Sequence, residues 1–133
     1  MTAGSPAEIL RHSSLFRGLP DSCVERMASL TRRRHYDRGQ IVFMRGDPTD
    51  GIYGVIAGEI RITTDSDDGQ QQFLNIMQPG DVFGEISLAD GGPRSANAVA
   101  AQETHIFVIE RRPFLDALPQ EPELTERLLT LLS

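Results

Sequence analysis

Hydrophobic and polar positions divide the chain into a helical first part, a middle of short strands and a helical last part. In the first part, three apolar side chains recur at the spacing i, i+4, i+7 of one helix face: Cys23, Met27 and Leu30. Ser22 and Glu25 have the spacing of a capping box, which satisfies backbone N–H groups at a helix start. The pattern predicts a helix over residues 21–31.

Between residues 39 and 109, segments rich in Val, Ile, Phe and Thr alternate with turn signals about every ten residues. They predict six strands: Ile41–Met44, Ile52–Ile56, Glu59–Thr64, Gln71–Met77, Ala96–Ala101 and Thr104–Glu110. Within the third, we expect Ile60, Ile62 and Thr64 to face one way and Arg61 and Thr63 the other. Many short strands with Gly and Pro turns predict an antiparallel sandwich or barrel.

Two later stretches depart from the strand pattern. Residues 83–90 lack period-two alternation and predict one or two helical turns that start just after Gly84. Pro113 fits the first turn of a further helix, and Pro122 opens the last one. That last helix carries an apolar stripe: Leu124, Leu128, Leu129 and Leu132. The stripe runs to Ser133 without a cap, which indicates either a truncated chain or a helix that packs on a partner.

Length and charge narrow the class of protein. A chain of 133 residues predicts one domain, with a helical segment over 1–38, a β-rich part over 39–110 and C-terminal helices over 113–133. The net charge is −6 and all 13 basic residues are Arg, so we expect no direct binding to nucleic acid. The run Arg32–Arg34 is interpreted as the solvated end of a helix. Neither a membrane span nor a secretory signal is present, which predicts a soluble, cytoplasmic protein.

Cysteine and histidine usage argues against metal centres and catalysis. The single Cys23 excludes an internal disulfide, a cysteine-based zinc site and a four-cysteine iron–sulfur cluster. His12, His35 and His105 lie far apart in the sequence, so we predict no metal site, and His105 is interpreted as a structural strand residue. No nucleophile-elbow motif occurs, so we expect no enzyme and no cofactor. Residues 47–50 are interpreted as a hairpin turn.

One segment, residues 83–96, carries recognisable chemistry. Gly84 allows the backbone to approach a ligand closely and precedes a short helix. Free N–H groups at that helix start favour an anion: those of Glu85, Ile86 and Ser87. Arg94 adds a charged fork for a phosphate, and Ser95 adds a hydroxyl donor. Because phosphate repels a carboxylate, Glu85 fits a neutral hydroxyl such as a ribose 2′-OH. The set therefore describes a phosphate close to a ribose.

These residues resemble the phosphate-binding cassette of cyclic nucleotide-binding domains. The chain reads FGEISL over residues 83–88 and PRSA over residues 93–96, where that family has F-G-E, an aliphatic residue, a small residue and Leu, then P-R-(A/S/T)-A. Upstream turns fit the family as well: Arg38-Gly39-Gln40, Gly46-Asp47, Gly58-Glu59 and Gln78-Pro79-Gly80-Asp81. The resemblance covers about residues 9–133, which is nearly the whole chain.

The resemblance implies a mainly β fold, an eight-stranded antiparallel β-roll or jelly roll with flanking helices, that binds cAMP or cGMP. By position, Glu85 takes the ribose 2′-hydroxyl and Arg94 the cyclic phosphate. Ser95 leans toward cAMP, because Thr at that position is associated with cGMP. Further ligand contacts are implied for six positions: Leu74, Phe83, Gly84, Ile86, Ser87 and Ala96. The family caps the base with a C-terminal helix, for which this chain offers only residues 121–133, so the capping residues are missing or come from a second subunit.

The resemblance favours a regulatory sensor of the Crp–Fnr type, with a homodimer formed through the C-terminal helix and a DNA-binding domain, where one exists, downstream. Met1 lies shortly before the domain, which favours an N-terminal or free-standing sensor. Alternatives are a channel or kinase regulatory domain, a haem or iron–sulfur sensor, and a scaffold that binds no ligand. The scaffold is disfavoured here because a vacant pocket would bury Arg94 as an unpaired charge.

Overall fold

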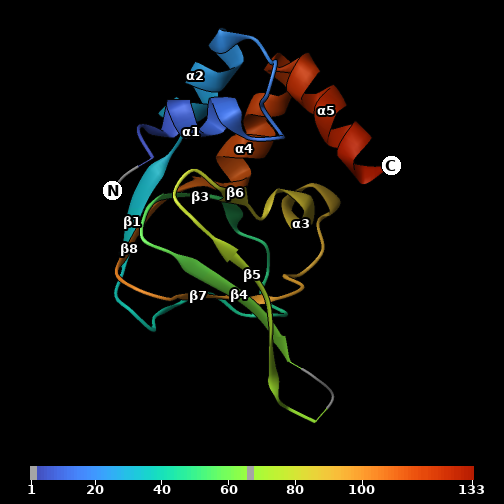
Figure 1. Cartoon of the computed structure of the whole chain (residues 1–133). Coiled ribbons are helices and arrows are strands. Elements are labelled where there is room, and N and C mark those ends of the chain that lie inside the picture. The colour runs from blue at the N-terminus through green and yellow to red at the C-terminus, as the bar shows by residue number, and fades with distance from the viewer. Residues whose placement is uncertain (1–2, 66–67) are drawn as a thin grey trace.

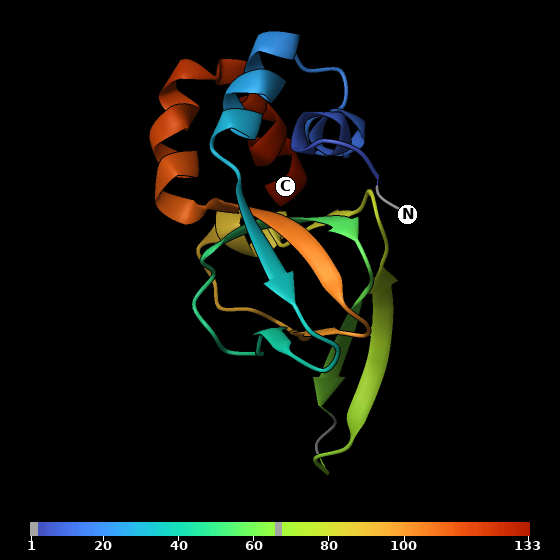
Figure 2. The ribbon, with the colours of Figure 1, turned by 90° about the vertical axis from the view of Figure 1, so that its left-hand side faces the viewer.

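Two antiparallel sheets face each other and the helices gather at one end of them (Figures 1 and 2). The computed structural model describes residues 3–65 and 68–133. The strands are β1 (Arg32–Tyr36), β2 (Ile41–Phe43), β3 (Gly51–Ala57), β4 (Ile60–Asp65), β5 (Gln71–Met77), β6 (Val82–Phe83), β7 (Asn97–Ala100) and β8 (Thr104–Glu110). The helices are α1 (Pro6–His12), α2 (Asp21–Ser29), α3 (Glu85–Asp90), α4 (Arg111–Ala117) and α5 (Pro122–Leu132), with a 3₁₀ turn over Leu118–Gln120.

The strand order is β1-β8-β3-β6 in one sheet and β2-β7-β4-β5 in the other. This arrangement confirms the predicted mainly β fold and the jelly-roll architecture that the resemblance implied. All six strands predicted from the residues are present, with bounds that differ by a residue or two. β1 and β6 are the two strands that the hydrophobic pattern did not predict.

β3 and β8 lie at the centre of the molecule, because each is buried on both faces. One face packs against the helices in a cluster that includes Ile52, Ile56, Phe107 and Ile109. The other face meets the second sheet in a cluster that includes Tyr53, Val55, Ile106 and Val108. β3 needs a glycine at position 54, opposite Phe107 of β8, since a Cβ there would lie 2.1 Å from the Phe107 ring.

In the N-terminal part, one prediction is wrong, and one helix, α1, was not predicted. The capping box belongs to α1, where Ser5 and Glu8 each accept from the other's backbone N–H. The box predicted for Ser22 and Glu25 is wrong, because α2 begins after Pro20 and has no side-chain cap. The predicted helix itself is confirmed over Asp21–Ser29, with Cys23 buried on its inner face.

Two further predictions in the β-rich part are wrong. Arg32–Arg34 do not end a helix but form most of β1, an edge strand that pairs with β8. The predicted alternation in β4 fails at Thr63, which is 3% exposed, whereas Arg61 on the same predicted face is exposed. Beside Thr63, β5 contributes one extra residue, Leu74, to its pairing with β4.

The C-terminal helices form as predicted, but the apolar stripe of α5 is divided. Leu124 and Leu128 are buried in the cluster beneath the helices, whereas Leu129 is 64% exposed. Leu132 is exposed as well, so the stripe does not present one continuous free face. Among the described residues, no helix is both long and apolar enough to span a membrane.

Candidate functional site

A cavity of about 270 Å³ opens where the two sheets and α3 meet. Its wall includes most of the residues predicted to bind a ligand: Phe83, Gly84, Glu85, Ser87, Arg94, Ser95 and Ala96. The structure thus brings together the start of α3, with the two residues before it, and the segment that follows α3. The remaining wall is apolar and comes from four strands: Phe43, Ile62, Met77 and Val82. Sequence reasoning missed these four, because nothing local distinguishes them from ordinary core residues.

The turn into α3 depends on Gly84. This residue has φ +90°, a left-handed conformation that L side chains rarely adopt. A Cβ at the same position would also lie 2.6 Å from Nη1 of Arg94. Gly84 therefore allows both the sharp start of the helix predicted here and the close approach of the Arg94 guanidinium to the backbone.

Arg94 is the central charge of the site and is almost fully buried, with its side chain 2% exposed. Its Nη2 donates to the backbone oxygen of Gly51 at 2.7 Å and to Oδ1 of Asp50 at 3.3 Å. Its Nη1 donates to the backbone oxygen of Gly84 at 3.3 Å. The guanidinium also lies 4.2 Å from the centre of the Phe43 ring, a cation–π contact.

Arg94 therefore has partners within the protein, and the expectation that a vacant pocket would leave its charge unpaired is wrong. Asp50 supplies a counter-charge and two carbonyl groups accept hydrogen bonds. One donor is nevertheless unsatisfied: within the described residues, Nε of Arg94 is buried and has no hydrogen-bond partner. A buried N–H without a partner costs free energy.

Asp50 links Arg94 to β1 and β3. Its Oδ1 accepts from the Tyr53 hydroxyl, and its Oδ2 lies 3.9 Å from Nη1 of Arg34. Burial, and next the hydrogen bond to Asp50, raise the pKa of Tyr53. Sequence reasoning missed Asp50 because residues 47–50 were interpreted as a hairpin turn. That interpretation is wrong, since the segment connects β2 in one sheet to β3 in the other.

Among the described residues of the cavity wall, Glu85 is the only acidic one. Burial raises the pKa of its carboxyl, and two smaller effects oppose the shift: a hydrogen bond from its own backbone N–H and the charge of Arg94. The carboxylate is therefore costly to hold in its charged form where it lies. A hydroxyl group that donated to it would favour the charged form.

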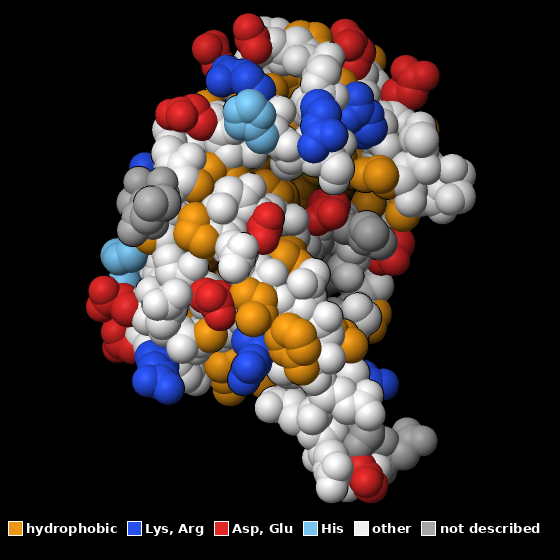
Figure 3. All heavy atoms as spheres, in the orientation of Figure 1, with side chains coloured by type: hydrophobic (Ala, Val, Ile, Leu, Met, Phe, Trp, Pro, Cys, Tyr) orange, Lys and Arg blue, Asp and Glu red, His pale blue; other side chains and the backbone are white. Residues whose placement is uncertain are grey.

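The four remaining predicted residues do not all lie on the cavity wall. Ser87 and the exposed Ser95 lie on the cavity wall. Leu74 is not among the lining residues: it projects from β5 with 54% of its surface exposed, and its contact with a ligand stays a prediction. Figure 3 shows hydrophobic side chains on the surface over β4 and β5, and Phe73 and Leu74 are exposed there. Ile86 belongs to α3, but its side chain lies outside the described part of the structure.

The wall as a whole combines one buried cation, one partly buried carboxylate, two hydroxyls and an apolar remainder. This chemistry fits a small anion that also carries a hydroxyl and an apolar surface. The described lining residues include two Ser but no His or Cys, so neither hydroxyl has a histidine beside it on the cavity wall to act as a general base.

Comparison with known proteins identifies the family of this chain. The model of the cyclic nucleotide-binding domain matches residues 33–121. The CRP-like cAMP-activated global transcriptional regulator of Mycobacterium tuberculosis is 32% identical over 126 residues, which are 95% of this chain and 56% of that protein. The cyclic AMP receptor protein of Thermus thermophilus is 35% identical over 124 residues, 93% of this chain and 57% of that protein.

Among solved structures, the N-terminal domain of a transcriptional regulator from Streptomyces coelicolor superposes with a TM-score of 0.82 at 30% identity. The match covers 91% of this chain and 86% of that one. The chain spans a little over half the length of the two curated relatives that it matches. Family model, relatives and fold agree, and the chain belongs to the cyclic nucleotide-binding domain family, as a regulatory domain of the Crp–Fnr type.

Proposed function

We propose that this chain is a sensor module that binds cAMP in preference to cGMP and has no catalytic activity of its own. The observation that carries the proposal is Arg94, a buried guanidinium on the wall of a cavity, whose Nε has no partner within the described residues. The names of the two relatives and the Ser at position 95 support cAMP as the ligand.

In this proposal the cyclic phosphate pairs with Arg94 and Glu85 accepts a hydrogen bond from the ribose 2′-hydroxyl. The phosphate competes with Asp50 for the guanidinium. That exchange is feasible because the Asp50 side chain is 53% exposed and remains solvated when its partner turns away. The backbone of Gly84, Ile86 and Ser87 faces the same anion at the start of α3.

The signal passes from α3 to α5. Leu88 of α3 belongs to the same buried cluster as Leu124 and Leu128 of α5, and the two helices are in contact. A ligand that holds α3 more firmly therefore favours the arrangement in which α5 is docked. The mechanism is a population shift, with a size limited by the difference in ligand affinity between the two arrangements.

The output lies outside this chain. We propose that this chain is the N-terminal effector domain of a transcription regulator, since the Mycobacterium relative is named as one and both relatives are nearly twice as long. With a net charge of −6, the domain itself is a poor partner for DNA. The exposed Leu129, Leu131 and Leu132 of α5 form the surface through which we expect two copies to associate.

Calorimetric titration with cAMP and cGMP tests whether the chain binds a cyclic nucleotide and which of the two it prefers. Arg94→Ala should weaken cAMP binding by about 30- to 1,000-fold, because a charge-assisted pair is lost. Arg94→Lys keeps the charge but not the planar fork, so it should also weaken binding. Arg112→Ala, at an exposed position of α4, is the matched control and should leave the affinity unchanged. Unchanged affinity in both Arg94 variants, with their fold intact by circular dichroism, contradicts the assignment.

A scaffold that binds no ligand is the second candidate, and the ion pair between Arg94 and Asp50 favours it, because that pair balances the charge without a ligand. Thermal unfolding separates the two candidates. A ligand present at 100 times its dissociation constant adds about 2.7 kcal/mol of stability. No shift of the midpoint at millimolar cAMP or cGMP would favour the scaffold.

A further inference from the structure

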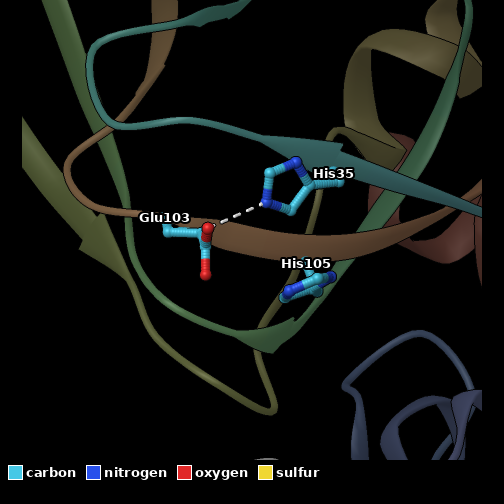
Figure 4. Close-up of side chains that lie close together, drawn as sticks. All are labelled: His35, Glu103 and His105. Atoms are coloured by element: carbon cyan, nitrogen blue, oxygen red, sulfur yellow. Dashed lines mark ion pairs between the residues drawn. The ribbon is translucent and has the colours of Figure 1, made fainter.

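Three side chains with metal-binding atoms meet at the edge of the β1-β8 sheet, away from the cavity. His35 of β1 and His105 of β8 are direct partners in the antiparallel register, and Glu103 immediately precedes β8. Figure 4 shows the two imidazoles on adjacent strands with the Glu103 carboxylate beside them. The prediction of no metal site relied on sequence separation. Strand pairing removes that separation, because residues 70 positions apart become neighbours.

The distances fit a single ion. The metal-binding atoms of the three residues lie within 4.8 Å of one another, and Nε2 of His35 is 3.3 Å from Oε2 of Glu103. In a tetrahedral zinc site with bonds of about 2.0–2.2 Å, two ligand atoms lie about 3.3–3.6 Å apart. The imidazole centres are 4.7 Å apart, so a small side-chain rotation of His105 completes the set.

A second carboxylate, that of Asp37, lies near His35. Its Oδ1 is 3.9 Å from Nδ1 of His35, whereas Glu103 is next to Nε2. That distance is too long for a hydrogen bond, so Asp37 adds negative charge near the three ligands and does not fix the ring. Arg33 is the nearest cation on the same face of β1, two residues away. The two carboxylates outnumber it, so the local charge does not oppose a divalent cation.

We propose that His35, His105 and Glu103 form a binding site for a divalent transition-metal ion, with zinc as the best match. Two imidazoles and one carboxylate are ligands that zinc favours, and the exposure of all three leaves the fourth position to water. The site is independent of the proposed nucleotide function, because none of its residues lines the cavity.

The experiment uses the untagged 133-residue chain after removal of metals with a chelator. Titration with zinc chloride in a calorimeter should show one equivalent bound per chain. Cobalt chloride should give the visible absorption of a Co²⁺ ion in a site of low coordination number. His35→Ala, His105→Ala and Glu103→Gln should each weaken zinc binding by about tenfold or more. His12→Ala is the matched control, since His12 is an exposed histidine on α1, and its affinity should stay unchanged.

Two results would overturn the proposal. One is that the metal-free chain binds no zinc in the titration. The other is that binding persists in the His35 and His105 variants or falls equally in His12→Ala. All three ligands are exposed side chains, so the variants should fold normally, and thermal unfolding confirms that before titration. Where a variant does not fold, the absence of zinc binding by the wild type still overturns the proposal, and the remaining variants locate the ion.

Discussion

Glu85 lines the candidate site at a cost to the stability of the fold. Its carboxyl is partly buried beside the cavity, and burial raises its pKa. A raised pKa in the folded state means that folding favours the neutral form. The stabilising contribution of that form is present below the ordinary pKa of 4.5 and is lost as the pH rises through the raised value. At neutral pH the folded chain therefore bears a charged group in an unfavourable place.

Glu85→Gln should remove this cost. Because Gln is neutral at every pH, the variant should unfold at a higher temperature than the wild type near pH 7. The difference should shrink toward zero as the pH falls below 4.5 and the wild-type carboxyl becomes protonated. Thermal melts between pH 3 and pH 8 measure it, with the exposed Glu126→Gln as control. A midpoint that is lower in the variant at pH 7 would show that the charged carboxylate stabilises the fold.

Which residues the sequence could identify depended on how far apart their partners lie. Gly84, Glu85 and Arg94 occur within twelve positions of one another, so their chemistry could be read from one short segment. Asp50 meets Arg94 across 44 positions, and His35 meets His105 across 70. Those contacts depend on strand register and on the connection between sheets, which hydrophobic periodicity does not determine.

The composition and length of β1 and β6 explain why the hydrophobic pattern did not predict these two strands. β1 reads Arg-Arg-Arg-His-Tyr and lies at a sheet edge, where polar and charged residues are typical. β6 has only two residues, which is too short for an alternating pattern. The strands predicted well are those with two or more apolar residues between Gly or Pro turns, because burial of those residues determines the structure.

Helix α5 offers a prediction from two adjacent leucines. Leu128 is 6% exposed and packs in the cluster beneath the helices, whereas Leu129 is 64% exposed. Leu128→Ala should lower the free energy of unfolding by about 2–5 kcal/mol, the usual cost of a buried Leu-to-Ala change. Leu129→Ala should change it by less than about 0.5 kcal/mol. Urea denaturation of both variants measures the difference, and similar losses in the two would mean that α5 is packed differently.

At the scale of the whole molecule, the two hydrophobic clusters share their central strands. Alternate residues of β3 and β8 belong to the helix-side cluster and to the cluster between the sheets. If the helices were to detach, Ile52, Phe107 and Ile109 would be exposed, although their neighbours along the strands would still be packed. The clusters are thus coupled through the backbone of two strands, and the described fold has no boundary at which one could unfold alone.

This coupling predicts one cooperative unfolding transition. The chain contains no Trp and two Tyr, Tyr36 and Tyr53, which both pack in the cluster between the sheets. Near-ultraviolet circular dichroism therefore reports on that cluster, and the signal at 222 nm reports mainly on the helices. The two melting curves should have the same midpoint, as two-state unfolding requires. In Leu128→Ala, a change confined to the helix-side cluster, both midpoints should fall by the same amount. A loss of helix signal at a lower temperature than the tyrosine signal would show that the helical layer unfolds independently of the sheets.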